Sequence, residues 1–231
     1  MSSLTRRRTE AVLAAAIGGA LGSVVAAPLG LAALGAGVGA TNGLISGWRS
    51  TYQWGTVRGN VAFALDSTWA LPVTASGVAS HAVAAVQRDG GFDPPSSERQ
   101  NRHVYRRGFV LRRGFVITVG NVVSGAGDVS QPRRRRLVTD HEDVHVWQSR
   151  WFGPTYPLLY AGWMVAAGAY GGARWLLGDR PASLSRTVET YAYYLNPFEW
   201  WAYSRDDNWP PSGKVAGIGW QRPLVSPRHA T

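Results

Sequence analysis

The segment His141-Glu142-Asp143-Val144-His145 holds the residues of this chain that are best suited to chemistry. On a helix, two histidines four residues apart project from the same face, one turn apart. That spacing lets both imidazoles bind one tetrahedral zinc and leaves room for a third ligand and a water. We therefore predict a zinc site with His141 and His145 as two of its ligands.

Glu142 follows the first histidine and places a carboxylate beside such a metal. In zinc peptidases the carboxylate at this position takes the proton from metal-bound water and can pass it to the leaving amine. We therefore predict that Glu142 is the catalytic residue. The structural alternative is a pair of surface histidines on an ordinary helix, which the apolar neighbours Val144 and Val146 disfavour.

A third protein ligand is needed, and because the chain has no cysteine it must be a His, Asp or Glu. We select Glu199, which opens a short expected helix among aromatic residues, with Ala202 leaving space beside the carboxylate. The structural alternative is a carboxylate stabilised by the dipole at a helix N-terminus. The other candidates for the third ligand are Glu189, the runner-up, and His103, Asp206 and Asp207.

The His-Glu-x-x-His motif followed by Glu-x-x-Ala at Glu199 resembles the gluzincin metalloproteases, and their membrane-embedded branch most closely. The resemblance covers about residues 137–207 and implies that His141, His145 and Glu199 bind zinc and that the substrate is a peptide or protein. An Asp commonly follows the Ala in that branch, whereas Tyr203 follows it here. The N-terminal half has no counterpart in the family.

The elements that must position the motif are expected to be mainly helical. The motif helix should run from about Thr139 to Trp151, capped by Thr139 or Asp140 and ended by Gly153-Pro154, just after the basic run 133–136. The apolar stretch 156–177 follows. If it crossed a membrane once, Glu199 would lie on the opposite side from His141. Either the stretch is therefore a buried or membrane-embedded helix pair, which we expect, with a bend at Gly171-Gly172, or Glu199 is not the ligand.

The uncharged stretch from Ala11 to Gly47 is longer than one bilayer span of about 20 residues, and Pro28 lies near its middle. We predict a helical hairpin broken at Pro28. Four glycines at spacing four share one helix face and form a glycine zipper, which predicts close packing and a homo-oligomer. These glycines are Gly35, Gly39, Gly43 and Gly47. A flexible Gly/Ala linker and a signal peptide are the alternatives.

Between these parts, residues 61–88 read as helix interrupted at Asp66 and Pro72, and 89–101 as a loop. The runs 104–111 and 115–123 read as strands of a β-hairpin joined at Arg112-Arg113-Gly114. Residues 115–119 could form an edge strand that binds extended peptide. Helices are expected at 185–195 and 198–203, and loop from Asn208. The fold class is therefore α+β, mainly helical, with a membrane hairpin in residues 1–60 and a metalloprotease-like domain in residues 61–231.

The net charge of +10 comes almost wholly from arginine, with Lys214 the only lysine. Basic runs that flank apolar segments are typical of membrane proteins, and no nucleic-acid-binding module is recognisable, so we expect a membrane partner and no nucleic acid. The predicted function is a zinc-dependent metallopeptidase, that is, a zinc metalloendopeptidase-like hydrolase, acting at or near a membrane. We expect this to be a bacterial inner membrane. The alternative is a non-enzymatic membrane protein with a structural zinc and glycine-driven oligomerisation.

Overall fold

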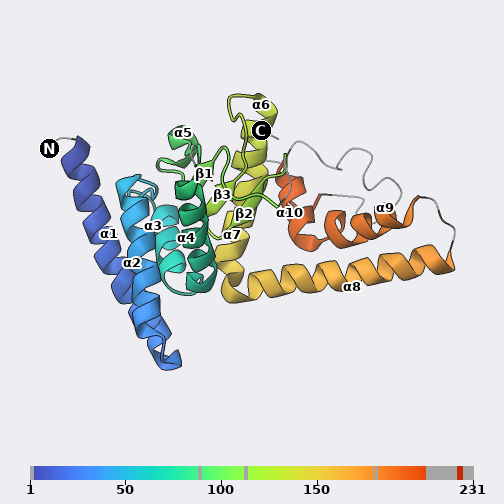
Figure 1. The fold of residues 1–231 in the computed structure, drawn as a ribbon, viewed down its shortest axis with the longest axis horizontal. Coiled ribbons are helices and arrows are strands. Elements are labelled where there is room, and N and C mark those ends of the chain that lie inside the picture. Colours follow the sequence, from blue (N-terminus) through green and yellow to red (C-terminus); the bar gives the residue numbers. More distant parts are fainter. Residues whose placement is uncertain are drawn as a thin grey trace. The chain divides into compact units, whose positions relative to one another are not determined.

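The computed structural model describes residues 3–87, 90–111, 114–178, 180, 182–206 and 223–225 (Figure 1). Contacts divide the chain into two compact units, Met1–Pro154 and Thr155–Thr231. The boundary predicted after residue 60 falls inside the first unit. Helices predominate and one small sheet is present, which confirms the predicted α+β, mainly helical class. Most of the tail predicted as loop from Asn208 lies outside the described residues.

The first unit begins with the predicted helical hairpin. Helix α1 (Ser3–Ala26) leads through a 3₁₀ turn, η1 (Ala27–Leu29), into α2 (Ala32–Trp48), and the two helices lie side by side (Figure 1). The helix breaks at Pro28, as predicted, because proline cannot continue a helical hydrogen-bond ladder. Gly30 follows with a φ of 72°, a left-handed conformation that glycine adopts without steric cost.

The glycine repeat of α2 faces α1 and closes the hairpin. A methyl group on Gly18 of α1 would lie only 2.6 Å from the carbonyl oxygen of Gly39, and one on Gly47 would lie 2.5 Å from the Cα of Ala11. The two backbones approach this closely because these positions carry no side chain. All four repeat glycines are buried. A second copy of the chain could therefore use the same glycine face only if the hairpin opened.

Two further helices complete the helical part of the first unit. Helix α3 (Val57–Ser67) begins at Thr56, whose hydroxyl accepts a 3.0 Å hydrogen bond from the Gly59 amide. Helix α4 (Leu71–Val86) follows at about 90° to it, with Pro72 in its first turn. The helix is interrupted once, between Ser67 and Leu71, whereas the predicted interruption sites Asp66 and Pro72 lie within α3 and α4 on either side of this break. The region predicted as loop also contains one short helix, α5 (Pro94–Ser97).

The sheet differs from the prediction in its pairing. Its strands are β1 (His103–Tyr105), β2 (Ile117–Val119) and β3 (Val122–Ser124), in the order β1-β3-β2. Strand β1 pairs with β3 in parallel, while β2 and β3 form the antiparallel hairpin. The predicted hairpin between the runs 104–111 and 115–123 is therefore wrong.

The true hairpin joint is the two-residue turn Gly120-Asn121, since Val119 pairs directly with Val122. Gly120 has a φ of 58°, and glycine at the first position is favoured in such turns. At the predicted joint, Arg112 and Arg113 lie outside the described residues. The predicted edge strand is confirmed for Ile117–Val119, because β2 ends the strand order.

The motif lies on a helix longer than predicted. It runs without interruption through α6 (Pro132–Arg136), a π-helical turn η2 (Leu137–Glu142) and α7 (Asp143–Phe152). The basic cluster thus forms the first turn of this helix, and Thr139 and Asp140 are not its caps. The helix starts earlier because Pro132 is suited to the first helical turn. It ends as predicted at Gly153, whose φ is 51°, and a 3₁₀ turn, η3 (Gly153–Thr155), follows.

The sheet packs against this helix through a small core of buried valines. Val104 of β1 and Val123 of β3 form one cluster with Val138 of η2 and Val146 of α7. Ser149 of α7 also donates a 3.0 Å hydrogen bond to the Gly120 carbonyl in the hairpin turn. The sheet and its turn are thereby fixed along the motif helix.

The second unit contains α8 (Tyr156–Leu177), α9 (Leu184–Glu189), a π-helical turn η4 (Thr190–Tyr194) and α10 (Pro197–Arg205). The helices predicted at 185–195 and 198–203 are confirmed. Helix α8 is continuous, so the predicted bend at Gly171-Gly172 is wrong. Only Gly168 and Gly171 of α8 are buried, so α8 is not a buried core helix. Gly171 instead permits close contact, since a methyl group there would lie 2.8 Å from the Tyr191 ring.

One N-terminal helix, Ser3–Leu29 including its 3₁₀ turn, is long and apolar enough to span a membrane. Helices α3 and α4 reach the same composition only when they are taken together as one bent segment. The outer side of α1 carries exposed apolar side chains, among them Val12, Leu13, Ile17 and Val24.

Candidate metal centre

The two motif histidines converge within the first unit. Their Nε2 atoms lie 3.2 Å apart, their ring centroids are 4.9 Å apart, and both side chains are buried. Two nitrogens bound to one tetrahedral zinc at about 2.05 Å would lie roughly 3.3 Å apart. The His141 and His145 side chains are therefore spaced as two ligands of a single ion.

The motif straddles a change in helix type. His141 and Glu142 belong to the π-helical turn η2, whereas His145 lies in the following α-helix α7. Single π turns within α-helices are rare and are frequent at functional sites. Here the turn contributes the first histidine and the carboxylate of the motif.

Gln148 orients the second histidine. Its Oε1 lies 2.8 Å from Nδ1 of His145, and both residues are buried. Because an amide oxygen only accepts, Nδ1 carries the proton in this arrangement, and the Nε2 lone pair is left on the side that faces His141. Metal-binding histidines typically have such a partner on the other ring nitrogen, because it fixes both tautomer and ring orientation.

The edge strand of the sheet fixes the side chain of Glu142 through a hydrogen bond. The hydroxyl of Thr118, in the middle of β2, donates a 2.7 Å hydrogen bond to Oε2 of Glu142. Glu142 itself is 5 % exposed. The strand that ends the sheet therefore lies directly beside the carboxylate of the motif, and Thr118 limits the orientations that this carboxylate can adopt.

Asp143, the third motif residue, anchors the helix. Its Oδ1 accepts a 2.6 Å hydrogen bond from the nearly buried Arg102, and its Oδ2 accepts one of 2.9 Å from Arg58. Replacing one partner of such a buried pair leaves an uncompensated charge, which typically costs several kcal/mol. Asp143 therefore fixes the position of the motif helix through its ion pairs with Arg102 and Arg58.

A second buried ion pair fixes the C-terminal half of the motif helix. Arg150 donates two hydrogen bonds, of 2.9 and 2.8 Å, to the carboxylate of Asp66 in α3. Burial alone would lower the pKa of Arg150, but the adjacent Asp66 carboxylate outweighs it and raises that pKa, so the guanidinium stays charged. Tyr52 also donates a 2.8 Å hydrogen bond to Asp66, and the Asn121 side-chain amide donates one of 3.3 Å.

The predicted third ligand, Glu199, belongs to the second unit. It lies in the first turn of α10, where the Asn196 side chain caps the helix by accepting a 3.0 Å bond from the Phe198 amide. Glu199 is buried, and its Oε1 accepts a 2.6 Å hydrogen bond from the Tyr160 hydroxyl of α8. Its role as third ligand stays a prediction.

The alternative ligands differ in their surroundings. Glu189 is 45 % exposed and lies 3.6 Å from Arg186. Asp206 is buried at the end of α10. Asp207 lies outside the described residues.

The side chain of His103 makes its contacts with other residues of the first unit and not with the two motif histidines. Its Nε2 lies 3.0 Å from the Ser46 hydroxyl, and its ring packs edge-on against His81 at 4.4 Å. Complete burial lowers the pKa of His103 well below its usual value, and electrostatic interactions with the neighbouring His81, Arg49 and Arg150 lower it further. His103 is therefore neutral and serves the packing of the sheet against α2.

Two residues that support the site were not identified from the sequence. Gln148 follows His145 by three positions, so helical spacing places it on the same face as the histidine pair, and that signal was available. Thr118 had no such signal, because its contact with Glu142 depends on how β2 pairs and packs. The expected edge strand was found, but not the hydroxyl that it presents to the motif.

Comparisons with known protein families, with curated proteins and with solved structures find no match for this chain. The resemblance of the motif to gluzincin metalloproteases therefore stays a hypothesis that rests on the residues themselves.

Proposed function

We propose that this protein is a zinc-dependent peptidase that acts at or near a membrane. The observation that carries the proposal is the 3.2 Å separation of the His141 and His145 Nε2 atoms, with the Glu142 carboxylate beside them in the motif. Imidazole ligands in a tetrahedral arrangement favour zinc over the hard cations magnesium and calcium, which prefer oxygen ligands.

Each motif side chain has a distinct task in this proposal. A zinc ion would act as a Lewis acid that polarises a water and the peptide carbonyl. His141 and His145 would hold it, with Gln148 fixing the second ring. Glu142 accepts the proton of the attacking water and then gives it to the leaving amine, while Thr118 keeps its carboxylate oriented.

The substrate in this proposal is a peptide or protein segment in extended form. Strand β2 ends the sheet and carries the residue that holds Glu142, so a peptide paired with β2 would pass beside the reacting carboxylate. Such strand addition binds the backbone through main-chain hydrogen bonds and reads alternate side chains. This supports peptide-bond hydrolysis over chemistry on a small ligand.

Glu199 remains our proposed third ligand. A buried carboxylate is costly unless it is paired, hydrogen-bonded or bound to a metal, and Glu199 is 2 % exposed. The hydrogen bond from Tyr160 is the kind of support that metal-binding carboxylates receive. Glu189 is a weaker candidate because it is exposed and lies beside Arg186.

The membrane part of the proposal rests on the hairpin. Helix α1 is long and apolar enough to cross a bilayer, and its exposed side chains are largely apolar. Arg6, Arg7 and Arg8 at its start would stay on the cytoplasmic side by the positive-inside rule. We propose the inner membrane of a bacterium as the location.

The proposal is tested by measuring peptide-library cleavage and zinc content together on the purified full chain. Glu142→Gln should keep the zinc and lose cleavage by about 10²–10⁴-fold, because the amide cannot accept the proton. Glu98→Gln, a change at an exposed acid of the first unit, is the matched control and should leave both readouts unchanged. Full cleavage by Glu142→Gln would contradict the mechanism. Bound zinc with no cleavage by the wild type would favour a structural zinc site instead.

A further inference from the structure

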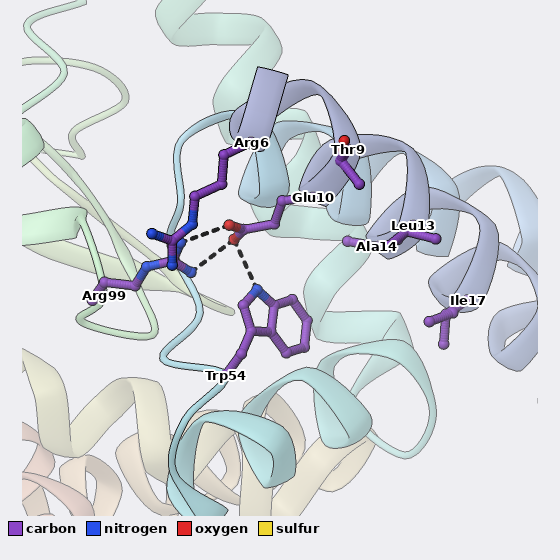
Figure 2. Close-up of a pocket in the computed structure, with 8 residues that line it drawn as sticks. All are labelled: Arg6, Thr9, Glu10, Leu13, Ala14, Ile17, Trp54 and Arg99. Atoms are coloured by element: carbon purple, nitrogen blue, oxygen red, sulfur yellow. Dashed lines mark hydrogen bonds and ion pairs between the residues drawn. The ribbon is translucent and has the colours of Figure 1, made fainter. Parts of the chain in front are cut away.

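A cavity of about 380 Å³ lies beside the start of α1, apart from the metal-binding motif (Figure 2). Its size falls within the range of small-molecule sites. Figure 2 shows charged groups at one end, where Arg6 and Arg99 lie beside Glu10, and apolar side chains further along α1, where Leu13 and Ile17 project. The cavity is therefore polar at one end and apolar along its length.

The charged end is built around Glu10. Arg99 donates two hydrogen bonds to its carboxylate, of 2.8 and 2.6 Å, and the Trp54 indole nitrogen donates a third of 2.8 Å. This fixes Arg99 and Trp54 in place and neutralises one positive charge. The carboxylate and both partners form a preorganised wall of the cavity.

Arg6 adds a charge that this wall does not neutralise. It is exposed, and it forms no ion pair or hydrogen bond with any residue in the part of the chain that the structure describes. Arg6, Arg99 and Glu10 together carry a net charge of +1, which matches the single negative charge of a phosphodiester. Guanidinium groups bind phosphate oxygens well because their N–H donors form a planar fork.

The apolar part of the cavity extends along α1, away from the charged end. Ile17 lies eleven positions after Arg6, a distance of roughly 16 Å along the axis of a helix. Leu13 and Ile17 are 56 % and 51 % exposed, and the Trp54 ring packs 5.0 Å from Phe63 beside them. An apolar chain lying along these residues would pack against their side chains and the wall of the cavity.

We propose that this cavity binds an anionic phospholipid, with its phosphate at Arg6 and Arg99 and the upper part of one acyl chain along Leu13 and Ile17. The position within α1 argues for a lipid over a soluble phosphate. Helix α1 is long and apolar enough to cross a membrane, and in that position the arginines at its start lie at headgroup level and Ile17 lies deeper. The inference depends on this placement of α1 and not on peptidase activity.

The test is lipid binding to the detergent-solubilised full chain, measured by native mass spectrometry. Phosphatidylglycerol is compared with phosphatidylcholine of the same acyl chains and with glycerophosphoglycerol, which is the same phosphodiester headgroup without acyl chains. We expect phosphatidylglycerol to bind most tightly and glycerophosphoglycerol to bind negligibly. Equal binding of both lipids, or glycerophosphoglycerol binding as tightly as phosphatidylglycerol, would overturn the proposal.

Two matched pairs of variants locate the site. Arg6→Gln should weaken phosphatidylglycerol binding about tenfold, because a charge-assisted hydrogen bond is lost. Arg8→Gln removes the same charge from a residue that does not line the cavity, and it should bind as the wild type does. Ile17→Ser should weaken binding several-fold, whereas Val24→Ser, an exposed change further along α1, should not.

These pairs separate a defined site from general attraction to charge. Equal losses in Arg6→Gln and Arg8→Gln would mean a diffuse basic surface and would refute the cavity as the binding site. Equal losses in Ile17→Ser and Val24→Ser would refute the acyl-chain path in the same way. Helical circular dichroism of each variant matching that of the wild type excludes misfolding as the cause of a loss.

Discussion

The Thr118 hydroxyl donates a 2.7 Å hydrogen bond to Oε2 of Glu142 and so connects the edge strand of the sheet to the acid of the metal-binding motif. Thr118 lies at the centre of β2, and Glu142 lies in the π-helical turn next to His141. The strand that we propose binds the substrate therefore also orients Glu142, the carboxylate that we propose transfers protons in the reaction.

The first prediction concerns this hydrogen bond. Thr118→Val should lower kcat for peptide cleavage about tenfold, because hydrogen bonds to charged groups contribute roughly 1.5–3 kcal/mol. Zinc content should not change, because the Thr118 hydroxyl bonds to Glu142 and not to either histidine of the motif. Thr118→Ser keeps the hydroxyl and is the matched control. Equal activity in the Val and Ser variants would show that the hydroxyl does not position Glu142.

Gln148 should control metal affinity without touching the metal. In Gln148→Leu the Nδ1 of His145 loses its acceptor, and zinc affinity measured by competition with a chelator should fall by about 10–100-fold. Gln148→Glu retains an acceptor at the same place and should bind zinc far more tightly than the Leu variant. Indistinguishable affinities for the two variants would contradict the orienting role.

The close approach of α1 and α2 predicts opposite effects at two glycines of α2. Gly39 lies against the backbone of α1, so Gly39→Val should destabilise the hairpin and lower the Tm in detergent. A methyl group on Gly37 would meet no atom within 4 Å, so Gly37→Ala should be neutral or stabilise the fold by up to about 1 kcal/mol. A Tm for Gly39→Val equal to that of the wild type would mean that the two helices are not packed as described.

His103 should make the folded state sensitive to acid. Its pKa is held well below the usual value by burial and by nearby positive charges, so below about pH 6.5 the unfolded chain takes up a proton that the folded chain does not. The stability contributed by neutral His103 is complete above that pH and falls by up to about 1.4 kcal/mol per pH unit below it. Urea unfolding at pH 7.5 and pH 5.0 measures this loss. His103→Gln cannot titrate, so it should lose less stability over the interval; an equal loss would contradict the assignment.

Much of this arrangement follows from local sequence. The hairpin is marked by Pro28 and by glycines at spacing four, and the pairing of His141 with His145 follows from helical geometry. The end of the motif helix at Gly153 is likewise a local signal. These features depend on residues close together in the chain, so periodicity and turn chemistry are sufficient to predict them.

The features that sequence analysis missed depend on distant contacts. Strand β1 pairs in parallel with β3 instead of forming a hairpin with β2, and nothing in the residues 103–105 themselves specifies that partner. The turn at Gly120-Asn121 was overlooked because the apolar run through it reads as one strand. The ion pair of Arg150 with Asp66 joins residues 84 positions apart, which a pattern read along the chain cannot reveal.

The zinc site is tested by the zinc content of the purified full chain, measured by inductively coupled plasma mass spectrometry after dialysis against dilute zinc. We expect about one zinc per wild-type chain and none in His141→Ala or His145→Ala. Glu199→Gln should bind zinc more weakly, with Glu189→Gln as the matched control that binds as the wild type does. Equal zinc in the wild type and both histidine variants would show that the two histidines do not bind the metal.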